Sequence, residues 1–309
     1  MSETSPIDLL TVGSVAYDTI ETREHTAERI MGGSATFVSV TASRLCRPGI
    51  VGVVGDDYLT TNLELLADAG VNVDGIERKN GKTFFWHGRY SDDFSSRESL
   101  HTELGVFGAF DPIVPDAYKN APFLFLANIA PALQLKVLDQ VEKPKFVAMD
   151  TMDFWINGNR DDLLKVLKRV DAIFINDEES LLLTGERNTL IAARKLQEMG
   201  PEIVIIKKGE HGALMIAGDE MFAPPACLLE EVRDPTGAGD TFAGGFMGYL
   251  ASREELHPGE YRKATMMGTL MASFCVERFS LEGLFELDEE TIKNRYESLR
   301  DLIRVEPWL

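Results

Sequence analysis

The most informative segment of the chain reads Asp234-Pro235-Thr236-Gly237-Ala238-Gly239-Asp240-Thr241-Phe242-Ala243-Gly244-Gly245-Phe246. Its small residues, Gly237, Ala238 and Gly239, leave the N–H groups at the start of a helix unobstructed. Those N–H groups have no partner inside the helix, and the helix dipole makes that end positive, which suits a phosphate. Asp240 adds a carboxylate beside this anion site. A carboxylate there would repel a phosphate that is merely bound, but it suits a base that deprotonates a hydroxyl attacking the phosphorus. Taken alone, Gly-Ala-Gly-Asp is equally compatible with a tight turn whose first-turn acid is favoured by the dipole.

The residues after Asp240 predict a helix that is packed unusually closely. Phe242, Phe246 and Leu250 recur every four residues and therefore share one buried face. Three glycines in the same helix, at positions 244, 245 and 248, weaken it intrinsically. We therefore expect another element to approach the backbone of this helix very closely.

Composition is that of an ordinary globular protein. The 309 residues, of which 44% are hydrophobic, could form one large α/β domain or two smaller ones. No apolar run approaches the roughly 18 residues of a membrane span, and the first six residues, Met-Ser-Glu-Thr-Ser-Pro, lack the basic and apolar parts of a signal peptide. The three cysteines are few and far apart, so neither a disulfide framework nor a zinc site is indicated. We expect a cytoplasmic protein.

The charge of the chain limits its partners. A formal net charge of −19 argues against nucleic acid or an anionic membrane, both of which bind clustered Lys and Arg. A polyanion bound to this chain would depend on backbone amides and a divalent metal, with Lys207 and Lys208 as the candidate side chains.

Strands and helices are predicted to alternate along most of the chain. Apolar runs typical of buried parallel strands occur at 9–12, 50–54, 123–127, 146–149, 172–175 and 203–206. Helical patterns intervene around 36–45, 62–69, 132–141, 161–168 and 190–199. This alternation predicts a doubly wound, mostly parallel sheet with helices on both faces, and with ligands at the carboxyl ends of the strands. Gly13, Asn176 and Asp240 are each expected just after a strand.

Residues 82–107 interrupt the alternation. Their aromatic and β-branched content, with period-two spacing, predicts a pair of strands. The alternatives are an ordinary edge hairpin and a small lid. We favour a lid because Phe84 and Trp86 would otherwise lie on an open edge.

The Asp234–Phe246 segment closely resembles the second signature of the ribokinase-like (PfkB) carbohydrate kinase family, and further matches follow in the family's order. Thr11-Val12-Gly13-Ser14-Val15-Ala16-Tyr17-Asp18 resembles the first strand and its substrate-binding aspartate, and Gly32-Gly33-Ser34-Ala35-Thr36 resembles the double-glycine hinge. Asn176-Asp177-Glu178-Glu179 is similar to the Asn-x-x-Glu motif, and Lys208-Gly209-Glu210-His211-Gly212 to the glycine turn on the nucleotide side. The resemblance covers roughly residues 8–285. It implies a single ribokinase-like domain over residues 1–309, with a β lid built from about 15–31 and 82–108.

The resemblance also implies a role for each residue of the site. Asp240 is the base and the Gly237–Asp240 amides hold the transferring phosphoryl, while Asp18 grips sugar hydroxyls beside the Gly32-Gly33 hinge. The donor is ATP, bound with Mg2+, and the nucleotide side is formed by Asn176, Glu179, Lys208, Gly209 and Gly212. Glu179 would hold Mg2+, directly or through water, and Asp234 and Thr236 match positions that help bind K+. From spacing alone, Asn176 and Glu179 are better explained as a helix N-cap. Pairing of lids in relatives implies a possible homodimer.

Two departures from the family pattern bear on the substrate. Phe37 stands where sugar kinases usually have an Asn that bonds the sugar, and a phenyl ring can only stack on a base or on the apolar face of a sugar. Ser280 stands where relatives commonly have Gly, in the loop by the nucleotide.

Three functions follow from these observations. The leading one is an ATP-dependent kinase that phosphorylates a hydroxyl, most simply a primary CH2OH, of a small sugar or sugar derivative. The second is a nucleoside kinase of the same fold, favoured by Phe37 and the aromatic lid. The third is a non-catalytic regulatory protein on a kinase scaffold, against which the intact Gly-Ala-Gly-Asp argues.

Overall fold

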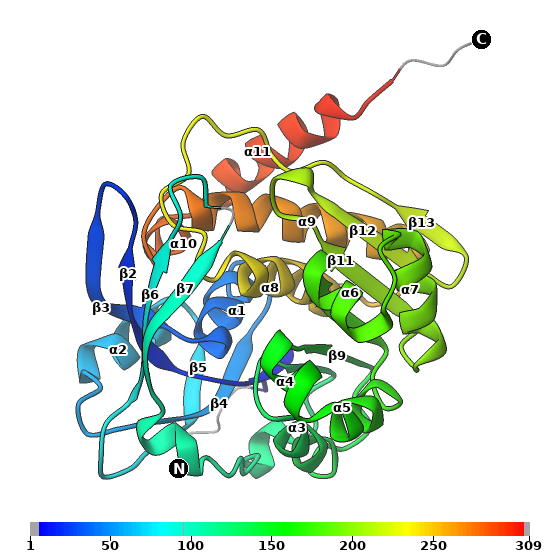
Figure 1. Ribbon diagram of the computed structural model, residues 1–309. Helices are drawn as coiled ribbons and strands as arrows, with labels where there is room; N and C mark the ends of the chain where they lie inside the picture. Colours follow the sequence, from blue (N-terminus) through cyan, green and yellow to red (C-terminus); the bar gives the residue numbers. More distant parts are fainter. Residues whose placement is uncertain (1–5, 95, 306–309) are drawn as a thin grey trace.

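The computed structural model describes residues 6–94 and 96–305, and its strands form two sheets of unequal size (Figure 1). The domain predicted to span residues 1–309 therefore includes residues that the structure does not describe, and one of them, residue 95, lies in the predicted lid. Among the described residues, the larger sheet has nine strands in the order β13-β12-β11-β10-β9-β8-β1-β4-β5. Their bounds are β1 (Leu9–Val12), β4 (Pro48–Val54), β5 (Asn72–Arg78), β8 (Phe123–Leu126), β9 (Phe146–Asp150), β10 (Ala172–Asn176), β11 (Ile203–Lys207), β12 (Ala213–Ala217) and β13 (Glu220–Phe222). The smaller sheet has the order β3-β2-β6-β7, with bounds β2 (Ala16–Glu21), β3 (Thr26–Gly32), β6 (Phe84–Tyr90) and β7 (Arg97–Glu103).

The large sheet is doubly wound, as the sequence predicts. Every pair of neighbours from β11 to β5 is parallel, and β12 and β13 extend one edge as antiparallel strands. The strand order reverses at β1, which lies between β8 and β4. In open sheets of this kind, ligands bind beyond the carboxyl ends of the strands at such a reversal.

Helices cover both faces of the large sheet. The helices are α1 (Ser34–Ala42), α2 (Thr60–Asp68), α3 (Pro131–Leu138), α4 (Asp153–Gly158), α5 (Arg160–Leu167), α6 (Asp177–Thr184), α7 (Thr189–Glu198), α8 (Ala238–Ala251), α9 (Pro258–Val276), α10 (Glu282–Phe285) and α11 (Glu289–Leu302). Side chains from α3, α5, α6 and α7 pack on one face, and those from α1, α8 and α9 pack on the other. Because both faces are covered, the inner parallel strands β1, β4, β8 and β9 are buried throughout, which explains their apolar sequences. No helix in the described part of the chain is long and apolar enough to cross a bilayer.

Helix α8 is packed as closely as its glycines predict. Phe242, Phe246 and Leu250 are buried, and α8 lies between α1 and α9. A Cβ at Gly244 would lie 2.5 Å from the Val38 carbonyl oxygen. A Cβ at Gly245 or at Gly248 would lie 2.9 Å from the backbone of α9 or α1, so the three glycines allow three helices to meet backbone to backbone.

The smaller sheet contains the predicted strand pair, β6 and β7, together with β2 and β3, which are joined by the short segment around residue 24. It lies at the left of Figure 1, beside the carboxyl ends of the large sheet. The β6–β7 and β2–β3 pairs are antiparallel, whereas β2 and β6 are parallel, so the two hairpins join through their inner strands. We call this sheet the lid.

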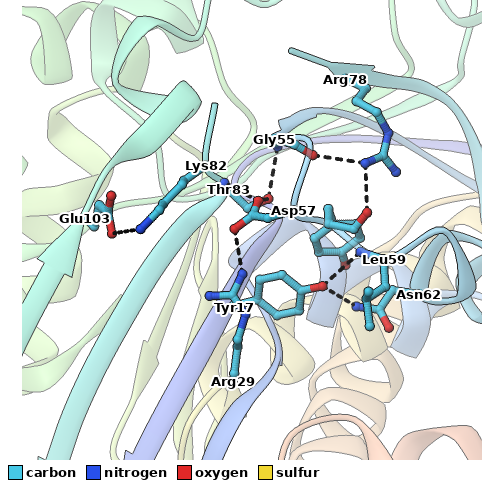
Figure 2. A network of polar contacts seen from close by, with 11 residues as sticks. Tyr17, Arg29, Gly55, Asp57, Leu59, Asn62, Arg78, Lys82, Thr83 and Glu103 are labelled. Atoms are coloured by element: carbon cyan, nitrogen blue, oxygen red, sulfur yellow. Dashed lines mark hydrogen bonds and ion pairs between the residues drawn. The ribbon is translucent and has the colours of Figure 1, made fainter. Parts of the chain in front are cut away.

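A network of polar contacts fixes the base of the lid to the large sheet (Figure 2). Asp57 accepts hydrogen bonds from the N–H and the hydroxyl of Thr83, both 2.7 Å, and from the Arg29 guanidinium at 2.6 Å. Burial alone would raise the pKa of Asp57, but the bonds from Thr83 and Arg29 outweigh it and hold the pKa below its ordinary value. On β2, the Tyr17 hydroxyl accepts from the Leu59 N–H at 3.0 Å and the Asn62 amide at 3.1 Å.

Candidate active site

The predicted anion site lies at the start of α8. Gly237 is the N-cap and has φ 76°, a left-handed conformation that favours glycine. The Ala238 N–H donates to the Pro235 carbonyl, and the first helical bond runs from Thr241 N–H to the Gly237 carbonyl. Between these, the N–H groups of Gly239 and Asp240 have no acceptor among the described residues. These two amides are free to hold an anion, whereas the Ala238 N–H is bonded within the turn at 3.2 Å, and its contribution to the anion site stays a prediction.

Asp240 lies in the first turn of α8 with a strongly perturbed carboxyl. Burial, and then the charge of Asp150, raise the pKa of Asp240 to about 7, while Lys207 and Arg97 act in the opposite direction. A base with a pKa near neutrality is well matched to accept a proton at physiological pH. The expectation that a strand leads directly to Asp240 is wrong, because β13 ends at Phe222 and an irregular segment connects it to α8.

An ion pair lies directly beside the anion site. Lys207, the last residue of β11, places its Nζ 3.0 Å from Oδ2 of Asp150, the last residue of β9. A Cβ at Gly239 would lie 2.9 Å from the same Nζ, so the ammonium group contacts the anion loop itself. Burial alone would lower the pKa of Lys207, but Asp150, Glu179 and Asp240 raise it above its ordinary value. Lys207 therefore remains charged, and its ammonium group lies where it could contact a phosphoryl held by α8.

Asp18 lies on β2 and is buried at the lid junction, the place where the lid continues into α1. Burial, with the charges of Asp234 and Asp240, raises the pKa of Asp18 to about 8. A Cβ at Gly32 would lie only 1.9 Å from Oδ2 of Asp18, so any larger residue there would displace the carboxyl. Gly33 has φ 97° and caps α1, where a Cβ would lie 2.5 Å from the Ser14 carbonyl oxygen. The double glycine thus makes room for the Asp18 carboxyl and turns the chain from the lid into α1.

Phe37 does not occupy the position that the sequence suggests. Its side chain is 2% exposed and belongs to the core formed with α9. A Cβ at Gly237 would lie 2.4 Å from the ring, so Phe37 supports the anion loop from behind. With so little exposed surface, it cannot stack on a substrate in this conformation.

Asn176 and Glu179 form a helix cap, as their spacing alone indicates. The Asn176 side chain accepts from the Glu179 N–H at 2.7 Å, and the Glu179 carboxylate accepts from the Asn176 N–H at 3.0 Å. This reciprocal capping box begins α6. Burial, and then Asp150, raise the pKa of Glu179 to about 7. Glu179 is thus both a capping residue and a member of the charge cluster around Lys207.

This cluster suits an additional cation. The charges of Asp150, Glu179 and Asp240 all act on the single ammonium of Lys207, and burial raises the pKa of Glu179 and of Asp240. Among residues 6–94 and 96–305, no group of three or more Asp, Glu, His or Cys side chains is arranged to hold a metal ion alone. A Mg2+ ion that is ligated mainly by nucleotide phosphates and water fits such a site.

The predicted glycine turn connects β11 to β12. Gly209 has φ 52° and Gly212 has φ 80°, and the Lys208 N–H donates to the Gly212 carbonyl at 2.8 Å. A Cβ at Gly212 would lie 2.1 Å from the Pro224 carbonyl oxygen. The turn therefore depends on both glycines and packs against the segment that leads to α8.

The side chains predicted to help bind K+ have protein partners. Asp234 accepts from the N–H groups of Thr236 at 2.8 Å and Ser280 at 3.1 Å, so it clamps two loops together. The Thr236 hydroxyl bonds to the Tyr90 hydroxyl of the lid at 3.0 Å. Ser280 has φ 54°, which explains why glycine suits this position, and its hydroxyl donates to the Met31 carbonyl at the lid base.

Arg97 is a site residue that the sequence did not reveal. It is the first residue of β7 and stacks over the Trp86 ring, with its guanidinium carbon 5.3 Å from the ring centroid. It pairs across the lid with Tyr90, whose hydroxyl bonds to Thr236 beside the anion site, and its positive charge acts against the rise in the pKa of Asp18 and Asp240. No salt bridge involves Arg97 in the described part of the chain. A single arginine in a polar turn has no sequence signal, because only the pairing of β6 with β7 brings it here.

The chain resembles known kinases over nearly its whole length. Residues 6–284 match the pattern of the pfkB family of carbohydrate kinases. A cytidine kinase of Thermococcus kodakarensis is 32% identical over 254 residues, which cover 80% of this chain and 90% of that protein. The structure of Burkholderia thailandensis nucleoside kinase in complex with inosine has a TM-score of 0.78 at 18% identity, covering 94% of this chain and 96% of that one. Arabidopsis thaliana ribokinase, complexed with ribose and ATP, has a TM-score of 0.76 at 20% identity, covering 94% and 99%.

Proposed function

The chain belongs to the pfkB family of carbohydrate kinases and is a phosphotransferase, and we propose that it phosphorylates the ribose of a nucleoside with ATP as donor. The non-catalytic alternative is thereby set aside. The observation that carries the choice of acceptor is a cavity of about 590 Å3 between the lid and α4. Its volume lies within the range of pockets that hold drug-sized ligands. Arg97 lines it from β7, opposite Tyr90, whose hydroxyl bonds to Thr236 beside the anion site, so a ribose held by Asp18 and Asp240 would have room beside it for a base.

In this proposal each part of the site has a role. Asp240 accepts the proton of the attacking hydroxyl, and the N–H groups of Gly239 and Asp240 hold the transferring phosphoryl together with Lys207. Removing one donor of such an anion hole typically raises the barrier by about 2.7–4 kcal/mol. Asp18 accepts hydrogen bonds from the ribose hydroxyls, and Arg97 supplies a second positive charge from the lid.

The nucleotide side follows from the same arrangement. The Lys208–Gly212 turn lies at the end of β11, next to Lys207, and would border the ATP phosphates. Mg2+ would be held near Glu179 and Asp150, where it would neutralise charge on the phosphates. A K+ ion beside the Asp234–Thr236 loop would rely on backbone carbonyls, because the two side chains are already bonded. A homodimer through the lid also remains a prediction, which sedimentation can test.

A free sugar is the second candidate acceptor. The observation in its favour is the buried Asp18 carboxyl, which accepts sugar hydroxyls whether or not a base is attached. A free pentose would leave the space beside Arg97 to water.

The test is ADP release with ATP, Mg2+ and K+ across a panel of nucleosides, sugars and sugar phosphates. We expect turnover with at least one nucleoside, and we expect the Asp240→Asn variant to lose at least about a hundredfold in rate while ATP affinity is nearly unchanged. Turnover confined to free sugars would establish the second candidate. Unchanged turnover in the variant would show that Asp240 is not the base.

A further inference from the structure

The cavity between the lid and α4 is lined by several polar side chains and by the ring of Phe154. Arg97 and Ser99 face it from β7, and Asp153, Phe154 and Asn157 face it from α4. It lies beside the reaction centre, since Met152 in its lining follows Asp150 by two residues, and Asp150 pairs with Lys207 at the Gly237–Asp240 turn. A group bound in this cavity would therefore be close enough to belong to the molecule being phosphorylated.

Helix α4 is held in place although it is short. The Trp155 indole N–H donates to Oδ1 of Asn128 at 2.8 Å, and the Asn128 amide lies 3.1 Å from the Met152 sulfur. Asn128 follows β8, next to the reversal of strand order, so α4 is tied to the carboxyl edge of the sheet. In Figure 1, α4 lies near this edge beside α5 and α6.

This anchoring presents the Phe154 ring at the cavity. Phe154 is 63% exposed, while Ile156, two residues later, is buried. Trp155 supports the ring edge to face, with 4.8 Å between centroids. Single exposed apolar residues are common on protein surfaces. Phe154 differs because it is an aromatic ring held on the wall of a cavity between polar side chains, which suits stacking with a flat base.

The polar groups around Phe154 discriminate between bases. Oδ1 of Asp153 accepts from the Phe154 N–H at 2.8 Å, which orients the carboxylate in the first turn of α4. A carboxylate accepts hydrogen bonds and donates none. It therefore favours an exocyclic amino group and repels a carbonyl oxygen at the same place. Opposite it, Arg97 offers only donors, and Ser99 already accepts from the Trp86 indole at 3.0 Å.

We propose that this cavity binds the base of the acceptor, that Phe154 stacks on it, and that Asp153 selects bases with an exocyclic amino group, such as cytosine or adenine, over their oxo counterparts, uracil or hypoxanthine. The proposal rests on the nucleoside kinase function proposed above. It identifies Asp153 and Phe154 as specificity-determining residues, distinct from the groups that perform phosphoryl transfer.

The experiment compares kcat/KM for two matched pairs, cytidine with uridine and adenosine with inosine. We expect the wild-type enzyme to prefer the amino member of at least one pair by about tenfold or more, because a buried or partly buried mismatch of hydrogen-bonding groups is costly. Asp153→Asn should bring the ratio close to one, mainly by raising KM for the amino compound. Phe154→Leu should raise KM for both members of a pair and leave their ratio and kcat nearly unchanged.

The matched control is Asp161→Asn, which removes a first-turn acid from the neighbouring helix α5, outside the cavity lining. It should leave the ratio as in the wild type. Equal wild-type activity on both members of each pair, or a preference that survives in Asp153→Asn, would overturn the proposal while leaving a nucleoside kinase. Turnover of free sugars alone would instead overturn the nucleoside kinase function, and this proposal with it.

Discussion

Removing the ion pair between Lys207 and Asp150 tests whether the site depends on the balance between its carboxyls and its ammonium group. We consider Lys207→Met, which keeps an unbranched side chain but removes its charge. The 3.0 Å separation corresponds to about 5.5 kcal/mol of attraction at an effective dielectric constant of about 20. The two side chains retain only 16% and 7% of their exposure, so Asp150 would be left as a nearly buried, unpaired charge. We expect the free energy of unfolding to fall by about 3–5 kcal/mol at about pH 8.

The same substitution should change the pH dependence of catalysis. Lys207 lowers the pKa of Asp240 and of Glu179, both of which nevertheless reach about 7. Without the ammonium, the pKa of Asp240 must rise further, so a higher pH is needed to generate the base. The rise of kcat/KM with pH should therefore move to higher pH in Lys207→Met, in addition to any loss of maximal rate.

Urea unfolding and a pH–rate profile measure the two effects, and two variants serve as controls. Lys165→Met breaks an exposed ion pair with Asp162 and should cost less than about 1 kcal/mol. Adding Asp150→Asn to Lys207→Met removes the stranded charge and should restore most of the lost stability. If Lys207→Met costs no more than Lys165→Met, and the double variant is no more stable than the single one, the reasoning is refuted.

Further predictions concern other parts of the site. For the wild-type enzyme, kcat/KM should rise with pH through about 7 and then level off, because Asp240 must be deprotonated to act as a base; a flat profile across that range would contradict this role. The pKa of Asp18 is raised to about 8, so the folded state binds this proton more tightly than the unfolded state and wild-type stability falls as pH rises from about 3.9 through about 8. Asp18→Asn should therefore be more stable, relative to the wild type, at about pH 9 than at about pH 6 in urea unfolding, and an equal difference at both pH values would disprove the assignment. Gly32→Ala should cost about 1–3 kcal/mol and raise KM for the acceptor, because its Cβ would displace the Asp18 carboxyl; unaltered thermal unfolding would count against the crowding. Asp57→Ala should destabilise the lid base by about 1.5–3 kcal/mol and increase hydrogen exchange in β6 and β7, and exchange identical to the wild type would show that the Thr83 and Arg29 contacts do not fix the lid.

The fold could be predicted because its elements carry strong local patterns. The predicted strands at 9–12, 123–127 and 203–206 differ from β1, β8 and β11 by at most one residue at an end, since uninterrupted apolar runs indicate strands covered on both faces. β5 was not predicted. It lies at the edge of the large sheet and is only partly buried, so its sequence lacks such a run.

Site residues could be predicted where the backbone conformation or close packing requires one residue type. They could not be predicted where their role depends on contacts between segments that are distant in the chain. The left-handed Gly237 and the crowded Gly32 are positions that only glycine satisfies well, and they mark the anion loop and the lid junction in the sequence. Phe37 was misplaced because its position in the chain does not reveal that its ring packs behind Gly237. Arg97 was missed because its neighbours in space, Asp18 and Asp240, are distant in the chain.

The glycines of α8 have a consequence for how substitutions in this protein would be read. Gly244, Gly245 and Gly248 lie one to two turns beyond Asp240, and a side chain at any of them would separate α8 from α1 or α9. A mutational scan scored by growth or activity alone would assign them the same severity as Asp240, and the essential region would seem to extend along the helix. Measuring cellular abundance alongside activity should divide that region, with the glycine variants depleted from the soluble fraction and Asp240→Asn retained at wild-type levels.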